Sequence, residues 1–246
     1  MFNFNQNNDN TFVNQNTGDI AVPKTFIANV FSWMAIALGI TAFFAYYFST
    51  NEAFISSLLT QTSKGVGMSG LGWVVMLAPL AFVLIMSFGF NKLSAGLLTL
   101  LFIAFSFIMG MSLSFIFIVY TGASIFLTFA VTAGTFGVMA IAGYTTKMDL
   151  SKFGSIMYMG LIGIVIASLV NMFMRNQMMD YIISIIGVLV FTGLTAWDVQ
   201  KLKRIGSQIE QGTESARKYV IMGALTLYLD FINLFLFLLR FLGNRK

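Results

Sequence analysis

The sequence predicts an all-α membrane protein that crosses the bilayer seven times. Only 9% of the 246 residues are charged and 58% are hydrophobic, whereas soluble domains carry roughly a quarter charged residues. The apolar residues form long continuous runs, and each crossing needs about 20 of them. Because only helices or closed barrels satisfy their backbone in lipid, and these runs do not alternate with polar residues, we expect a polytopic bundle of helices.

The first residues differ from the rest of the chain. MFNFNQNNDNTFVNQNTGDIAVP is rich in Asn and Gln and poor in apolar residues, so it cannot bury enough surface to fold by itself. It also lacks the basic start and apolar stretch of a signal peptide. We therefore predict a disordered, Asn-rich cytoplasmic tail over residues 1–24 and a seven-helix transmembrane domain over residues 25–246.

Seven apolar segments follow the tail, separated by polar or Gly-containing breaks. They are Phe26–Phe48, Leu71–Phe90, Leu97–Tyr120, Ile125–Tyr144, Ser155–Met174, Tyr181–Asp198 and Tyr219–Leu239. With the N-terminus inside, nine basic residues fall on the inner side and five on the outer side, which favours a cytoplasmic N-terminus and an external C-terminus. If the last segment dipped in and returned, the division would be twelve against two, but its helix, about 33 Å long, is long enough to cross.

Composition excludes several kinds of site. The chain has no Cys and no His, which excludes haem ligation by these residues, Cys and His zinc sites, thiol catalysis and Ser-His catalysis. We expect no cofactor and no enzymatic activity, and proton chemistry must use carboxylates, Tyr or Lys. The net charge of +5 comes from basic residues in short loops, which are topology signals, so nucleic acid is not an expected partner.

Two acidic residues lie within the apolar segments, Asp198 and Asp230. Asp230 lies in TLYLDFINLFLFLLR, about 16 Å along its helix from Tyr219 and hence near the bilayer midplane. A carboxylate at this depth must be protonated, paired or in contact with water. Thr226 and Asn233 lie on the same helical face, so this polar stripe is expected to face the bundle interior. Asp230 is either a functional ionisable group or a structural one that holds helices together by hydrogen bonds.

Asp198 ends the sixth segment, in FTGLTAWDVQKLKR. Thr195 and Lys201 lie three residues away on its own face, within reach of a side-chain interaction. The pattern therefore leaves two interpretations open, a functional carboxylate and an ordinary interfacial salt bridge to Lys201.

The last two helices are joined by a short loop and are expected to pack antiparallel, which would allow Asp198 to meet Asp230. At about 4 Å and an effective dielectric near 20, two like charges repel by roughly 4 kcal/mol. Such a pair holds one proton in acid and separates when it is lost, which makes it a candidate pH switch. The deprotonated pair would suit transient calcium binding. One difficulty is that Asp198, counted from Lys203, lies about 8 Å deep, so a tilt, a broken helix or a sixth segment that reaches below Lys203 is required.

The stretches LTAWDVQKLKR and ALTLYLDFINLFLFLLRFLG resemble the paired C-terminal signatures of the Bax inhibitor-1 family. GMSLS at 110–114 and AGY at 142–144 add looser support, so the resemblance covers nearly the whole chain after the tail. It implies a bacterial member in the cell membrane, a seven-helix fold with the last helix at the centre, and a pH-sensitive calcium leak. It also implies that Asp198 and Asp230 share a proton and control opening. The loop over Ile205–Arg217 is long for such a member.

Two other function classes stay open. The protein could regulate a membrane protease or a stress or cell-death pathway through its tail, a role that the resemblance suggests. Alternatively, two membrane aspartates could form an intramembrane aspartyl protease. The residues before Asp230 are Leu227, Tyr228 and Leu229, which is not the Gly-x-Gly-Asp pattern of those proteases, so this alternative is the weakest.

Overall fold

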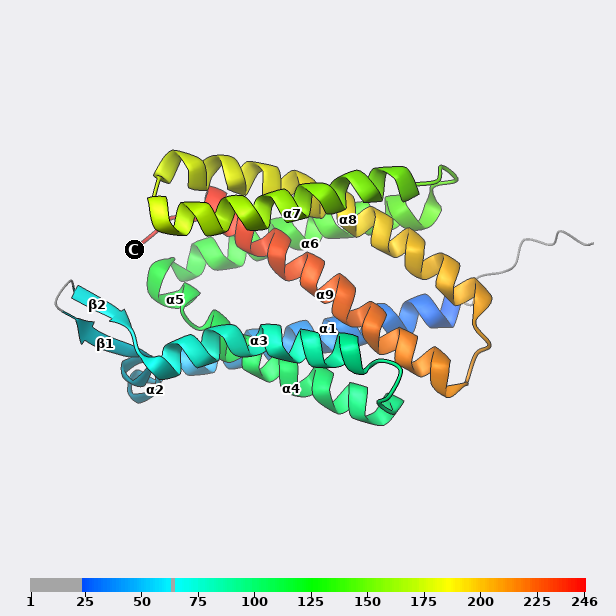
Figure 1. Cartoon of the computed structure of the whole chain (residues 1–246), viewed down its shortest axis with the longest axis horizontal. Helices are drawn as coiled ribbons and strands as arrows, with labels where there is room; N and C mark the ends of the chain where they lie inside the picture. The colour runs from blue at the N-terminus through cyan, green and yellow to red at the C-terminus, as the bar shows by residue number, and fades with distance from the viewer. Residues whose placement is uncertain (1–23, 63–64) are drawn as a thin grey trace, which may run out of the picture.

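The computed structural model describes residues 24–62 and 65–246, and long helices packed side by side make up most of this part of the chain (Figure 1). Seven of its helical segments are long and apolar enough to cross a membrane. They are α1 (Lys24–Ser49), α3 (Gly70–Gly89), α4 (Ala95–Leu113) continued by α5 (Ile116–Val119), α6 (Gly122–Thr145), α7 (Ser151–Met174), α8 (Gln177–Gln208) and α9 (Glu214–Leu242). The predicted all-α fold with seven spans is confirmed. Of the predicted tail, residues 1–23 lie outside the described residues.

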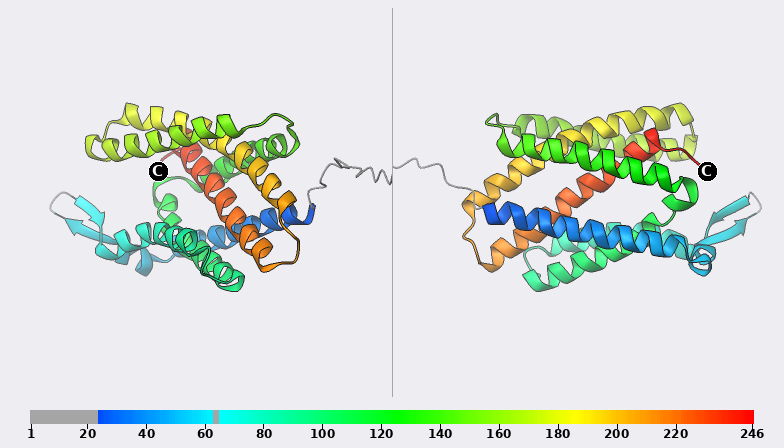
Figure 2. Two further views of the ribbon diagram at one scale, coloured as in Figure 1. Left: turned by 45° about the vertical axis from the view of Figure 1, so that its right-hand side comes forward. Right: turned by 180° about the vertical axis from the view of Figure 1, so that it is seen from behind.

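The helices form two layers with α9 between them. α6, α7 and α8 pack together on one side, α1, α3 and α4 pack together on the other, and α9 contacts α1, α4, α6 and α8. Figures 1 and 2 show α9 running diagonally across the space between the layers. Fifteen of its 29 residues are buried, against three of 24 in α7. The expectation that the last helix is central is therefore confirmed.

Capping residues explain where several helices begin. Ser69, Ser94, Thr121, Asn176 and Thr213 precede α3, α4, α6, α8 and α9, and each side chain accepts a hydrogen bond from a backbone N–H of the first turn. These N–H groups have no partner within the helix, so Ser, Thr and Asn favour a helix start.

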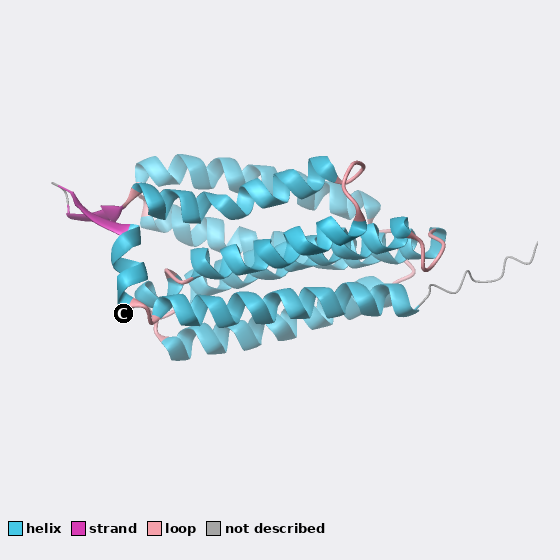
Figure 3. Ribbon diagram, turned by 90° about the horizontal axis from the view of Figure 1, so that it is seen from below, coloured by secondary structure: helices cyan, strands magenta, loops and turns pink. Residues whose placement is uncertain are grey.

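The segment between α1 and α3 contains structure that the sequence analysis did not predict. A short helix, α2 (Glu52–Leu58), leads into two strands, β1 (Leu59–Thr62) and β2 (Gly65–Met68), which pair antiparallel with Leu59 opposite Met68. Figure 3 shows this hairpin projecting from one end of the bundle. The strand pair is a local addition to the helical fold and lies outside the packed layers.

The last two spans are longer than their apolar runs. The sixth segment was predicted to end at Asp198, but α8 continues through polar residues to Gln208, and α9 begins at Glu214. The predicted loop of thirteen residues over Ile205–Arg217 therefore shortens to five residues, 209–213. Hydropathy marks the membrane-embedded part of a helix, and a helix that projects beyond the bilayer leaves no apolar signal.

The two ends of the described chain lie at opposite ends of the bundle, which agrees with an odd number of crossings (Figure 1). We call them the Lys24 end and the Arg240 end. At the Arg240 end the last residues pair with the junction of α5 and α6: Asn244 N donates to Ser124 Oγ at 2.8 Å, and Lys246 N donates to Val119 O at 2.9 Å.

Candidate functional site

The register between α8 and α9 is fixed by two close approaches. A Cβ at Gly187 of α8 would meet the ring of Phe237 at 2.6 Å, and a Cβ at Gly223 of α9 would meet Leu202 at 2.6 Å. Neither glycine can carry a side chain unless its neighbour moves. Small residues that let membrane helices approach closely are typical of such interfaces.

In this register Asp198 lies at the level of Thr226 and Leu227, and Asp230 follows three to four residues later on α9, an offset of about 5 Å. Every Cα–Cβ bond in a helix tilts toward the helix N-terminus. Because α8 and α9 run in opposite directions, Asp198 leans toward the level of Asp230, and Asp230 leans toward the level of Asp198. The two side chains therefore close the offset.

The structure brings the two aspartates together. Their carboxyl groups lie close enough to interact with each other, and the residues are only 6% and 5% exposed. The difficulty with depth is resolved because α8 runs to Gln208: Asp198 lies ten residues before this end, about 15 Å along the helix. Asp198 and Asp230 thus meet inside the bundle, away from either end.

The contact between the carboxyl groups accommodates one proton. Asp230 Oδ2 is buried and has no hydrogen-bond partner among the described residues. No Lys or Arg in the described part of the chain forms a salt bridge with either aspartate. A buried carboxylate oxygen without a donor is costly, and a hydrogen held between two carboxyl groups provides that donor. The arrangement can therefore take up and release a proton.

The other residues selected from the sequence do not hydrogen-bond to the aspartates. Thr195, Thr226 and Asn233 each donate to the backbone carbonyl four residues earlier on their own helix, those of Phe191, Met222 and Leu229. Lys201 Nζ lies over the ring of Trp197, 5.1 Å from its centroid. Among the described residues Lys201 forms no salt bridge with Asp198, although its charge acts on both aspartates.

The pair offers two carboxyl groups and no third acidic ligand. No cluster of three or more His, Cys, Asp or Glu side chains that could hold a metal ion occurs among residues 24–62 and 65–246. Calcium takes six to eight oxygen ligands, more than two carboxylates supply. The two carboxylates alone therefore do not complete the coordination shell of a calcium ion.

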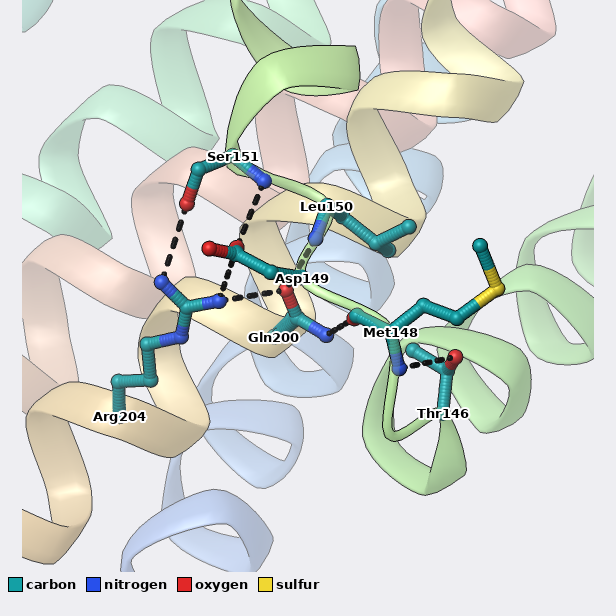
Figure 4. Close-up of polar contacts among 7 residues, drawn as sticks. All are labelled: Thr146, Met148, Asp149, Leu150, Ser151, Gln200 and Arg204. Atoms are coloured by element: carbon teal, nitrogen blue, oxygen red, sulfur yellow. Dashed lines mark hydrogen bonds and ion pairs between the residues drawn. The ribbon is translucent and has the colours of Figure 1, made fainter.

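A polar cluster that the sequence analysis missed joins α8 to the loop between α6 and α7 (Figure 4). Gln200 Nε2 donates to Met148 O at 2.8 Å, and Gln200 Oε1 accepts from Leu150 N at 2.9 Å. Arg204 pairs with Asp149 and donates to Gln200 Oε1 at 3.0 Å. We call this cluster the loop clamp. The Arg204 hydrogen bond, followed by the Ser151 backbone N–H, holds the pKa of Asp149 well below its usual range.

A second cluster that the sequence did not indicate lies on the face of α9 that points away from α8, toward α1 and α4. Thr41 Oγ1 donates to Ser106 O of α4 at 2.9 Å and lies 2.7 Å from the Tyr228 hydroxyl. Because the single hydroxyl hydrogen of Thr41 is used on Ser106 O, Tyr228 is the donor in the second bond. Thr41, Ser106 and Tyr228 are buried, and Phe105 and Phe102 pack edge-on against the tyrosine ring. We call this the Tyr228 node.

The chain matches known proteins over nearly its whole length. The family model described as "Inhibitor of apoptosis-promoting Bax1" matches residues 23–246. Inner membrane protein YbhL of Escherichia coli K12 is 50% identical over 224 residues, which cover 91% of this chain and 93% of YbhL. An uncharacterized protein of Borreliella burgdorferi is 44% identical over 232 residues, covering 94% and 97% of the two chains. An uncharacterized membrane protein of Streptococcus pyogenes serotype M1 is 36% identical over 225 residues, covering 89% and 92%.

Proposed function

The chain belongs to the Bax inhibitor-1 family of membrane proteins, and from this premise we propose that it is a pH-sensitive calcium leak of the inner membrane, gated by Asp198 and Asp230. The observation that carries the proposal is the contact of two buried carboxyl groups between the two most buried spans. Intramembrane acids are costly and are retained where they serve ion or proton pathways. The inner membrane is the location that the name of YbhL gives for that relative.

Gating follows from the charge of the pair. With one proton between them the carboxyl groups attract each other and hold α8 against α9. When the proton leaves to water, two like charges about 4 Å apart repel by roughly 4 kcal/mol at an effective dielectric near 20. This is enough to shift an equilibrium between closed and open states by about a thousandfold. We therefore expect the closed state in acid and opening as the pH rises.

Calcium as the permeating ion rests on the family membership and on the chemistry of the pair. Once separated, the two carboxylates present hard oxygen ligands of negative charge, which calcium prefers. Because they are few, the ion is not trapped, and a leak requires binding that is weak enough for release. Calcium and protons are thus the proposed ligands, and no cofactor enters the mechanism.

We also propose that the Lys24 end faces the cytoplasm. This end carries most of the basic residues of the described chain: Lys24, Lys92, Lys147, Lys152, Lys201, Lys203, Arg204, Arg217 and Lys218. Such an excess is typical of cytoplasmic loops. The alternative role as a regulator through residues 1–24 stays a prediction, as does the intramembrane protease.

The test is calcium uptake into proteoliposomes between about pH 6 and 8, the range in which a shared proton is expected to leave. Wild type is compared with Asp198→Asn and Asp230→Asn. We expect wild-type uptake to rise with pH. Each Asn variant should stay low and flat, because an amide and a carboxyl group hydrogen-bond without repulsion.

Asp180→Asn is the matched control, since Asp180 lies on α8 but bonds Asn171 and Arg240 at the other end of the helix. It should retain the wild-type profile. A wild-type pH response in both Asn variants of the pair would exclude the gating mechanism, and absence of calcium flux in the wild type would exclude the calcium leak.

A further inference from the structure

The two aspartates are held by different layers of the bundle. Asp198 is on α8, which the loop clamp ties to α6 and α7. The backbones of α6 and α8 also meet closely, since a Cβ at Gly143 would lie 2.2 Å from Ala196 O. Displacement of Asp198 relative to α6 would therefore break several polar and packing contacts at once.

Asp230 is anchored on the other side. Tyr228 lies two residues before Asp230, about 200° around the helix, so it points away from α8. Its hydroxyl bonds to Thr41 of α1, and Thr41 bonds to Ser106 O of α4. Both hydrogen bonds are buried, where polar groups are costly to leave unpaired. The Tyr228 node therefore fixes the rotation of α9 about its own axis relative to α1 and α4.

Rotation of α9 decides whether Asp230 meets Asp198. The contact requires Asp230 to face α8 within the narrow range of a hydrogen bond. Since the node and the pair lie on opposite faces of one rigid helix, a rotation that loosens the node also turns Asp230 away from α8. The other polar side chains of α9 near this level, Thr226 and Asn233, bond to their own helix and supply no such restraint.

We propose that Tyr228 and Thr41 are positioning residues of the aspartate pair: their hydrogen bond anchors α9 to α1 and α4 and sets the rotation at which Asp230 faces Asp198. This inference rests on the proposed function, since it concerns how the gate is held closed. In the closed protein α9 is thus held against α8 at the aspartate pair and against α1 and α4 at the Tyr228 node.

The experiment measures the separation of the two helix layers when the gate opens, without relying on calcium flux. The chain has no Cys, so Lys152→Cys on α7 and Asn29→Cys on α1, both exposed, place one spin label on each of the two helix layers in the full-length protein. Their distance distribution is recorded by electron paramagnetic resonance across the pH range. We expect a pH-dependent change in the wild type that Asp198→Asn and Asp230→Asn abolish.

Loss of the Tyr228 hydroxyl should move the midpoint of this change. The closed state holds a proton that the open state releases, so weakening the closed state lowers the midpoint. A net hydrogen-bond contribution of ordinary size corresponds to a shift of roughly half to one pH unit. Tyr228→Phe and Thr41→Val should both show it, whereas Thr41→Ser, which keeps the hydroxyl, should restore the wild-type midpoint.

Tyr219→Phe is the matched control, because Tyr219 is on the same helix but lies near its start and packs edge-on against Phe90, away from Thr41. It should leave the midpoint unchanged. If Tyr228→Phe and Thr41→Val behave like Tyr219→Phe while the Asn variants abolish the transition, the positioning role is overturned and the gate stands. If the Asn variants keep the wild-type transition, the gating mechanism itself fails, and the positioning role fails with it.

Discussion

Gly143→Ala is expected to separate α6 from α8 and to destabilise the bundle. The added Cβ would lie 2.2 Å from Ala196 O and 2.8 Å from its Cα, whereas ordinary contacts begin near 3.4 Å. The obstructing atoms belong to the backbone of a helix and cannot rotate away, so the two helices must part by about 1 Å at this level. Overpacking of this kind costs about 1–3 kcal/mol.

The substitution also has a favourable component, since alanine in a helix is about 0.5–1 kcal/mol better than glycine. Gly137→Ala isolates this component, because Gly137 is on the same helix and a Cβ there would meet no atom within 4 Å. We expect Gly143→Ala to unfold at a temperature several degrees below that of Gly137→Ala, as followed by loss of helical circular dichroism in detergent. Equal midpoints would refute the close contact between α6 and α8.

Two further predictions concern the polar clusters. Thr41→Val should destabilise the protein by about 1 kcal/mol more than Tyr228→Phe. The valine leaves the buried Tyr228 hydroxyl without an acceptor for its hydrogen, whereas the phenylalanine leaves only the acceptor oxygen of Thr41 unpaired. Chemical denaturation in mixed micelles gives the order of stability, and the reverse order would contradict the assignment of Tyr228 as donor. Ionised Asp149 stabilises the loop clamp in full above about pH 4, and this stabilisation is lost as the pH falls through the lowered pKa of Asp149. The Ser151 amide, which bonds to Asp149, should therefore exchange hydrogen faster in Asp149→Asn than in wild type at neutral pH, with the difference vanishing in strong acid.

The sequence was sufficient for the features that lipid imposes. Long apolar runs predicted the seven spans, and the two acids within them drew attention because charge is rare at that depth. The contact of Asp198 with Asp230 was expected only if α8 tilted, broke or extended below Lys203. α8 does extend beyond its apolar run, to Gln208. The added residues are polar, and hydropathy alone predicts a loop there because it does not detect a helix that projects beyond the membrane.

The supporting contacts could not be predicted in the same way. Thr41 and Tyr228 are 187 residues apart, and a single Thr in an apolar segment does not indicate its partner. Gln200 holds the α6–α7 loop by side-chain bonds to backbone atoms, which any loop residue can provide. The hairpin of β1 and β2 lies between two spans, where no apolar pattern constrains the chain.

The attachment of the last residues to the α5–α6 junction limits how the central helix can move. Asn244 and Lys246 continue directly from α9 and bond to Ser124 and Val119. A translation of α9 along its own axis would therefore break these hydrogen bonds. A movement of the Glu214 end of α9 about its C-terminal end leaves these hydrogen bonds intact. The C-terminal attachment is therefore expected to act as a pivot, and a rotation of α9 that parts the acids should be largest toward its Glu214 end.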